Sequence, residues 1–162
     1  MIKKTIIISP YSKKLRNTDN ENPKNYPFWH DVVFLLKEKD YKIIQIGIEG
    51  EERIGNTDEF LVSLPFDELK EKLKDCFVWI SVDNMINHLG AFIKKPGICL
   101  FGFSDPRIYG YEQNVNLLKD RKYLRKDQFG LWESIEYNQE VFVEPQEVVE
   151  AVEWFERKEL KN

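Results

Sequence analysis

The sequence has few of the residues that build metal sites and disulfide frameworks. It contains two cysteines and two histidines among 162 residues. Cys76 and Cys99 lie at the edges of apolar runs, so we expect small buried side chains there rather than reactive thiols. We therefore predict no metal site and no resident cofactor, and we expect a reducing, cytoplasmic compartment.

Long apolar segments and an excess of positive charge are also missing. No apolar run approaches the roughly eighteen residues of a membrane span. The N-terminal apolar stretch stops at Ser9-Pro10, which favours a first strand over a signal peptide. The 24 basic and 28 acidic residues give a net charge of −4, which argues against nucleic-acid binding or membrane coating. Nucleotides and sugar phosphates remain compatible, because local amides and one lysine can hold a phosphate.

Most standard catalytic motifs are absent as well. The chain has no G-x-G-x-x-G dinucleotide fingerprint, no G-x-S-x-G nucleophile elbow and no D-x-D pair. Residues 50–57 have the glycine spacing of a phosphate-binding P-loop, but Asn56 stands where lysine is required. Glu51 and Glu52 would also repel a triphosphate. These absences argue against the usual nucleotide-hydrolysing, dinucleotide-binding and serine-hydrolase chemistries.

What the chain does contain is a regular alternation of apolar runs and amphipathic stretches. Strands are predicted at residues 5–8, 42–47, 59–61, 77–82, 97–101 and 115–118, and helices from Pro27, Pro65, Met85 and near Pro145. This alternation predicts one α/β domain over residues 1–162, a Rossmann-like parallel sheet with helices on both faces. The polar, asparagine-rich residues 11–25 are predicted to form a long loop that is either functional or mobile.

The residues after the most apolar strand are the first candidates for a binding site. Ligands of such sheets bind beyond the carboxyl ends of the strands, where helix N-termini present unpaired amides. Asp83 and Asn84 occupy such a position, and His88 lies about one turn into the following helix. A simpler interpretation stays open, in which Asp83 only caps the helix and His88 is a satisfied interior side chain.

Residues 80–91 (ISVDNMINHLGA) and 95–106 (KPGICLFGFSDP) resemble glycosyltransferase family 9, the heptosyltransferase group. That family shows S-x-D-S/T-G-x-x-H-L-A-A, then K-P-x-x-x-L-F-G-x-T/S-D-P. Upstream, residues 24–27 (KNYP) resemble its K-x-W-P, residues 46–51 (IGIEGE) its I-G-x-x-x-E, and residues 64–69 (LPFDEL) its S-L-x-E-L. The order and spacing of these motifs agree over most of residues 5–111.

The resemblance implies the C-terminal, nucleotide-sugar-binding half of a two-domain GT-B glycosyltransferase. It places the donor diphosphate on Asp83, Asn84 and Met85, with His88 in the same pocket and Lys24 neutralising phosphate. His88 and Lys24 are accordingly the candidate catalytic residues, although Lys24 could also be an ordinary solvated charge. The other candidate substrate-binding residues are Ser9, Glu49, Glu51 and Asp105.

Two departures from the family pattern leave more than one function open. Asn84-Met85 replaces the usual Ser/Thr-Gly pair, which alters the diphosphate cradle. The second departure is that the family's acceptor domain, which carries the catalytic base, has no counterpart in these residues. That domain is expected to come from a second polypeptide or from a partner in a homo-oligomer. The first hypothesis is metal-independent transfer from a nucleotide-diphosphate sugar. The alternatives are a non-catalytic nucleotide-sugar-binding module that acts as a sensor, partner or sequestering protein, and a small hydrolase of nucleotide derivatives.

Other conspicuous residues have simpler structural explanations. Tyr26, Phe28 and Trp29 are predicted to pack onto the sheet, although stacking on a base is open to them. Trp132 is expected in the core or a lid, and Trp154 on the apolar face of the closing helix. The basic run 119–126 is expected to be a solvated face, with docking of nucleic acid or a second subunit as the alternative.

Overall fold

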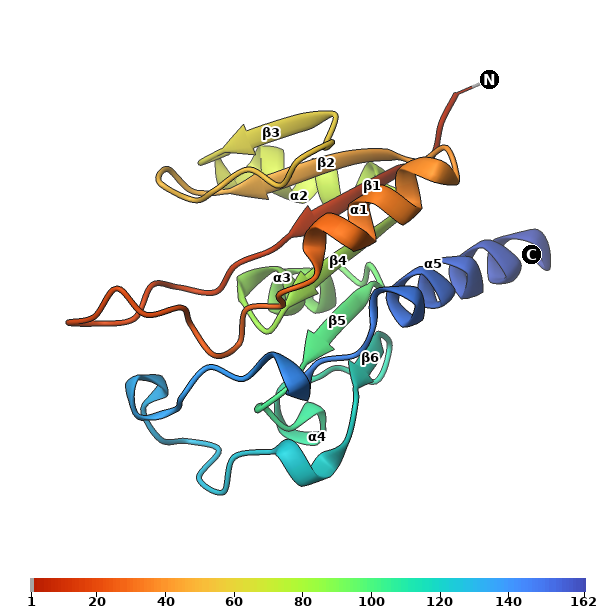
Figure 1. The fold of residues 1–162 in the computed structure, drawn as a ribbon. Helices are drawn as coiled ribbons and strands as arrows, with labels where there is room; N and C mark the ends of the chain where they lie inside the picture. The colour runs from red at the N-terminus through yellow and green to blue at the C-terminus, as the bar shows by residue number, and fades with distance from the viewer. Residues whose placement is uncertain (1) are drawn as a thin grey trace.

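The computed structural model describes residues 2–162 and shows one parallel sheet (Figure 1). Its strands are β1 (Thr5–Ser9), β2 (Lys42–Gly47), β3 (Glu59–Val62), β4 (Val78–Val82), β5 (Ile98–Phe101) and β6 (Val115–Leu118). They lie in the order β3-β2-β1-β4-β5-β6, and every neighbouring pair is parallel. The order reverses between β1 and β4, which is the point where doubly wound sheets bind ligands. The predicted fold class is confirmed.

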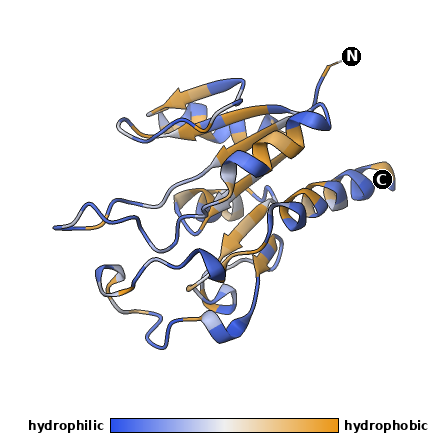
Figure 2. Cartoon of the chain, in the orientation of Figure 1, coloured by the Kyte–Doolittle hydropathy of each residue, from blue (hydrophilic) through white to orange (hydrophobic). Residues whose placement is uncertain are grey.

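Helices cover both faces of the sheet, as predicted. The helices are α1 (Trp29–Glu38), α2 (Phe66–Asp75), α3 (Met85–Phe92), α4 (Pro106–Tyr109) and α5 (Pro145–Leu160). Side chains of α1 and α5 share one apolar cluster with Ile6 and Ile8 of β1, whereas α2 and α3 share another with Ile7. Successive strand residues point to opposite faces, so each buried strand must be apolar on both sides. Figure 2 shows these apolar strands between the helices.

The single residues predicted for the core have mixed outcomes. Cys76, Cys99, Tyr26 and Trp29 are buried, as expected. Trp154 is 39% exposed, so its placement on the apolar face of the closing helix was wrong. The reason is helical geometry: it lies two residues, or about 200°, beyond Val152 of the buried stripe. Within residues 2–162 no helix is long and apolar enough to cross a membrane.

The long loop after β1 is held by its own side chains. The backbone N–H of Ser12 donates to Oδ1 of Asn25 at 2.7 Å, and Nδ2 of Asn22 donates to the carbonyl of Lys13 at 2.8 Å. The hydroxyl of Tyr137 donates to the carbonyl of Asn25 at 2.8 Å, which joins this loop to the segment before α5. Both segments lie beyond the carboxyl ends of the strands, while the two ends of the chain lie on the opposite side (Figure 1).

Candidate functional site

A cleft of about 390 Å³ opens at the carboxyl ends of β1, β2 and β3, beside the first turn of α3. It is therefore at the topological switch point of the sheet. Five of the predicted site residues line it, namely Ser9, Lys24, Glu51, Asn84 and Met85. The apolar part of its wall comes from the ends of the strands and from α2 and α3, and includes Ile46, Leu61, Leu69 and Ile86.

Asn84 joins the end of β1 to the start of α3. Its Oδ1 accepts the backbone N–H of Ile86 at 2.9 Å, so Asn84 is the N-cap of the helix. Its Nδ2 donates to Oγ of Ser9 at 3.0 Å and to the carbonyl of Tyr11 at 3.0 Å. One side chain therefore orients both the helix start and the β1 loop at the cleft. The interpretation in which Asp83 caps α3 was wrong.

Asp83 is instead a buried carboxylate behind the cleft. It is 6% exposed, and its Oδ2 accepts the hydroxyl of Ser104 at 3.0 Å. Nζ of Lys24 lies 3.8 Å from the same oxygen. The carbonyl of Asp83 also accepts the hydroxyl of Ser12 at 2.8 Å. A buried charge needs a counter-charge and hydrogen bonds, and the Lys24 ammonium at the cleft is the nearby counter-charge of Asp83.

Of the two glutamates considered after β2, the structure brings Glu51 to the cleft and leaves Glu49 in solvent. Oε1 of Glu51 accepts the backbone N–H of Ile48 at 2.7 Å. Glu51 folds over Gly47, where an added Cβ would lie 2.5 Å from that oxygen. Burial raises the pKa of the Glu51 carboxyl, and the Ile48 N–H and the Lys14 charge only partly oppose this. Glu51 therefore adds to the lining of the cleft a carboxyl group that is a weaker acid than an exposed glutamate.

His88 and Asp105 lie outside the lining of the cleft. His88 is exposed on α3, and its Nδ1 is 2.7 Å from the hydroxyl of Tyr111, so it is not an interior side chain. Asp105 caps α4 by accepting the N–H of Arg107 at 2.9 Å. It also accepts two hydrogen bonds from Arg121, at 3.0 and 2.7 Å, and these keep its pKa below the usual range.

Sequence reasoning missed several cleft residues. Tyr11, Ser12 and Lys13 belong to the loop that was predicted to be functional or mobile, but they were not named as site residues. Burial raises the pKa of Tyr11 to about 12, and its hydroxyl donates to the carbonyl of Glu52 at 3.0 Å. Leu64, the first residue of the motif at residues 64–69, and Ser63, which lies in no motif, also line the cleft. Within residues 2–162, no three histidine, cysteine or acidic side chains gather as a metal site would require.

The fold is similar to one half of several solved glycosyltransferases. E. coli ADP-heptose LPS heptosyltransferase II matches with a TM-score of 0.70 and 16% identity over 97% of this chain and 47% of that chain. The dodecameric, iron-containing heptosyltransferase TibC, solved with ADP-D-β-D-heptose, matches with a TM-score of 0.73 and 15% identity. The match covers 100% of this chain and 48% of that chain. The glycosyl transferase family 9 protein of Veillonella parvula matches with a TM-score of 0.71 and 17% identity, over 94% of this chain and 46% of that chain.

The chain therefore spans about half the length of these solved structures. No protein-family model and no curated protein sequence matches it. The structural match confirms the resemblance at the level of the fold: the chain has the architecture of one half of a family 9, GT-B heptosyltransferase.

Proposed function

We propose that the cleft binds a nucleotide-diphosphate sugar and that the chain is the C-terminal, donor-binding half of a metal-independent glycosyltransferase. One observation carries the proposal: Lys24, paired with buried Asp83, lines the same cleft as the start of α3. A cation and a helix N-terminus converging on one cavity are suited to an anionic diphosphate. The ADP-heptose in the TibC structure makes that nucleotide sugar the first ligand to test.

Each cleft residue takes a role that its surroundings suit. Lys24 and the first turn of α3 stabilise the diphosphate, first when bound and then as it leaves the sugar. Ser9 and Asn84 form the floor beneath it, and Met85 covers it. Glu51 accepts hydrogen bonds from the hydroxyl groups of the nucleoside.

His88, in the first turns of α3, is proposed as the second catalytic residue, which helps Lys24 to stabilise the leaving diphosphate. To do so its ring must turn from the Tyr111 hydroxyl towards the cleft, since Nδ1 is engaged there at 2.7 Å. The acceptor domain and the catalytic base that it carries would come from a separate protein or from a partner in a homo-oligomer. The two buried free cysteines support a cytoplasmic location.

One contact favours the alternative, a nucleotide-sugar-binding module without transfer activity. Oδ1 of Asn84 already accepts the N–H of Ile86, and Met85 lines the cleft at the position where the family has glycine. A glycine in place of Met85 would let phosphate approach the backbone closely. Binding without turnover in the presence of acceptors would distinguish this module from the transferase.

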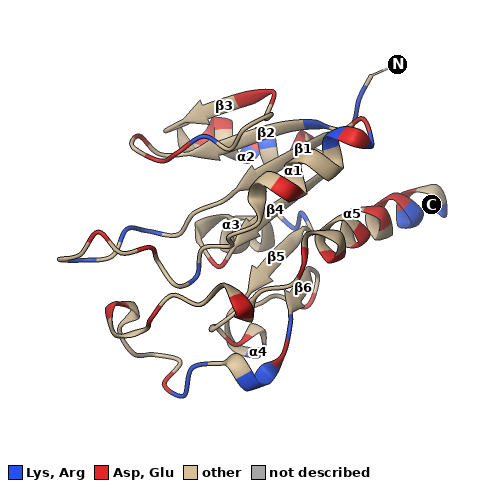
Figure 3. Ribbon diagram, in the orientation of Figure 1, with Lys and Arg blue, Asp and Glu red and all other residues tan. Residues whose placement is uncertain are grey.

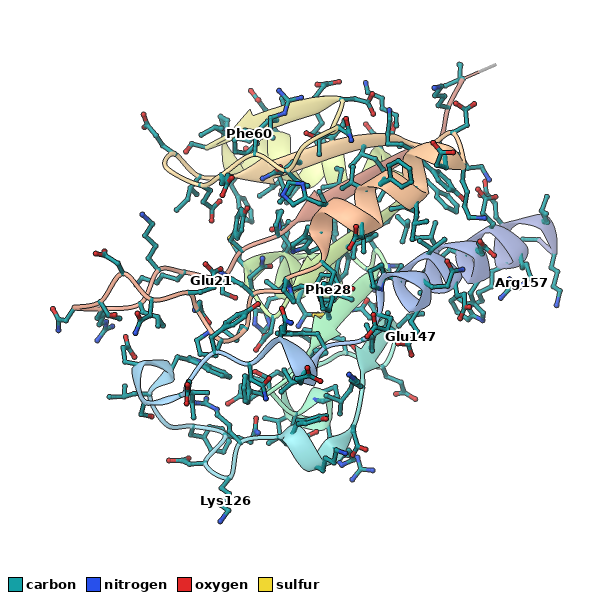
Figure 4. The ribbon with its side chains drawn as sticks, viewed as in Figure 1. Glu21, Phe28, Phe60, Lys126, Glu147 and Arg157 are labelled. Carbon is teal, nitrogen blue, oxygen red and sulfur yellow. The ribbon has the colours of Figure 1, made fainter. Side chains whose placement is uncertain are left out.

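The proposed function is tested by isothermal titration of the chain with ADP, UDP, GDP, CDP and ADP-heptose. We expect at least one nucleoside diphosphate to bind, and its sugar derivative to bind at the same site. Lys24→Gln should weaken that binding, whereas Lys126→Gln should not, because Lys126 is no part of the cleft lining and lies on the side of the molecule away from β1, β2 and β3 (Figure 4). Failure of every nucleotide to bind would overturn the proposal.

A further inference from the structure

A second cavity, of about 290 Å³, lies next to the cleft that we propose for the donor. Lys13, Lys14, Arg16 and Lys24, all from the loop after β1, line it together with Trp132 and Glu133 from the segment before α5. Lys13 and Lys24 also line the first cleft, so the two cavities adjoin. Lys14 and Arg16 do not line the donor cleft, so the second cavity has cations of its own.

The second cavity carries an excess of positive charge in a chain of net charge −4. Among residues 2–162, the contact of Lys24 with Asp83 is the one ion pair that these four cations make within 4.0 Å. Glu133 is the one acidic residue of the lining, and its Oε1 accepts the backbone N–H of Arg16 at 2.9 Å. Uncompensated cations around a concave surface concentrate anions there. The charges are visible on the β1 loop in Figure 3.

An aromatic wall completes the cavity. The guanidinium carbon of Arg125 lies 3.6 Å from the ring centroid of Trp132, and Nζ of Lys24 lies 5.4 Å from it. Arg125 is itself fixed, because it donates to the carbonyls of Gly130 and Gln128 at 2.8 Å each. An indole packed on a fixed guanidinium, with several cations beside it, suits a sugar that carries an acidic group, since the sugar ring can pack on the indole.

We infer that this cavity binds an anionic sugar, the phosphate- or carboxylate-bearing part of a second substrate, beside the donor. The inference rests on the proposed function, because it assigns the first cleft to the nucleotide sugar. Lys24 stands between the two cavities and would contact both anions. The charged group of the second substrate would lie against Arg16 and Lys14, with its ring along Trp132.

The test is an NMR titration of the whole chain at low ionic strength, following the indole N–H signal of Trp132. Glucose 6-phosphate, glucuronate and glucose are added with and without a saturating amount of the nucleotide that binds most tightly in the panel above. The first two probes distinguish phosphate from carboxylate, and glucose controls for the ring alone. We expect an acidic probe to bind with the nucleotide present, and glucose to bind at least about tenfold more weakly.

The double variant Lys14→Gln with Arg16→Gln should lower the affinity for the acidic probe about fivefold or more. It should change the affinity for the nucleotide less than about twofold. The double variant Arg157→Gln with Lys161→Gln removes the same charge from exposed positions at the end of α5, on the opposite side of the sheet (Figure 1), and should change neither affinity. Displacement of the probe by the nucleotide would overturn the inference, because the cavity would then belong to the donor site.

No binding of either acidic probe, with nucleotide binding intact, would overturn the inference and leave the proposed function standing. No binding of any nucleotide would instead contradict the proposed function. The assignment of the cavity to a second substrate would then fall with it, even if glucose 6-phosphate bound.

Discussion

Nδ2 of Asn84 lies 3.0 Å from Oγ of Ser9, so the helix cap after β4 is hydrogen-bonded to the last residue of β1. These are the two strands between which the sheet order reverses. The same Asn84 side chain caps α3 through the Ile86 N–H. The geometry of the proposed donor cleft and the stability of α3 therefore depend on one residue.

Asn84→Ala should lower the free energy of unfolding by about 1–2 kcal/mol, the cost of losing an N-cap and its partners. It should also weaken nucleotide binding, because Ser9 and the first turn of α3 lose their shared anchor. Urea denaturation and titration calorimetry measure the two effects. Asn138→Ala removes another asparagine cap, on the short helix Gln139–Val141, and should leave nucleotide affinity unchanged. Equal losses of affinity in both variants would contradict a local role for Asn84.

Lys24→Gln should weaken binding of a nucleoside diphosphate about tenfold, because it removes a charge-assisted contact to phosphate. The effect should shrink as salt is raised, since screening weakens the interaction that was lost. Titrations of the wild type and the variant at two salt concentrations check this. An effect of Lys24→Gln that does not depend on salt would mean that Lys24 acts through packing rather than charge.

Asp105→Ala should destabilise the protein by removing the cap of α4, at a cost of about 1 kcal/mol. A further, pH-dependent loss comes from the bond to Arg121. Because Arg121 lowers the folded-state pKa of Asp105, this contribution is present above the unfolded pKa and disappears as the pH falls through the folded pKa. The destabilisation should therefore be larger at pH 7 than at pH 2–3, as thermal unfolding can show.

Asp120→Ala is the matched control for Asp105→Ala. Asp120 caps the short helix Arg121–Tyr123 through the N–H of Lys122, at 2.9 Å. Among residues 2–162, Asp120 forms no ion pair within 4.0 Å, whereas Asp105 pairs with Arg121. The destabilisation caused by Asp120→Ala should therefore depend less on pH than that caused by Asp105→Ala. Both variants should bind nucleotides as the wild type does, since neither side chain lines the cleft. A lower nucleotide affinity of Asp105→Ala alone would return Asp105 to the candidate site.

Gly97→Ala should destabilise the fold by about 1–3 kcal/mol through overpacking. An added Cβ would lie 2.1 Å from the indole of Trp79, which is fully buried and donates to the carbonyl of Lys95 at 2.8 Å. The indole therefore has no room to move away. At Gly55 an added Cβ meets only the ring of His30, at 3.6 Å, so Gly55→Ala should change stability by less than about 0.5 kcal/mol. Urea denaturation of both variants tests the difference.

The architecture was predictable because it depends on local patterns. The apolar run at residues 78–82 and the amphipathic stretch at residues 66–75 are visible in any short window of the sequence, and the structure places β4 and α2 there. The four-residue helix α4 was missed, since no helix was predicted between the one from Met85 and the one near Pro145. A helix of one turn leaves too little periodicity to detect.

The candidate site was only partly predictable. Lys24 and Asn84 were identified from motifs, and both line the cleft. The motifs did not show that Asp105 forms an ion pair with Arg121, or that His88 is hydrogen-bonded to Tyr111. These partners lie 16 and 23 residues away along the chain. Contacts at such separations follow from packing rather than from neighbouring residues.

The sequence by itself determined the parallel sheet, its two helical layers and the strand ends where a ligand would bind. It could do so because burial on two faces imposes an apolar pattern on each strand, and that pattern is written in consecutive residues. Only the tertiary structure decided which polar side chains meet at those ends. It brought Lys24 to Asp83 and Trp132, and separated Glu49 from Glu51, because the loops that carry them pack across distances that no local pattern records.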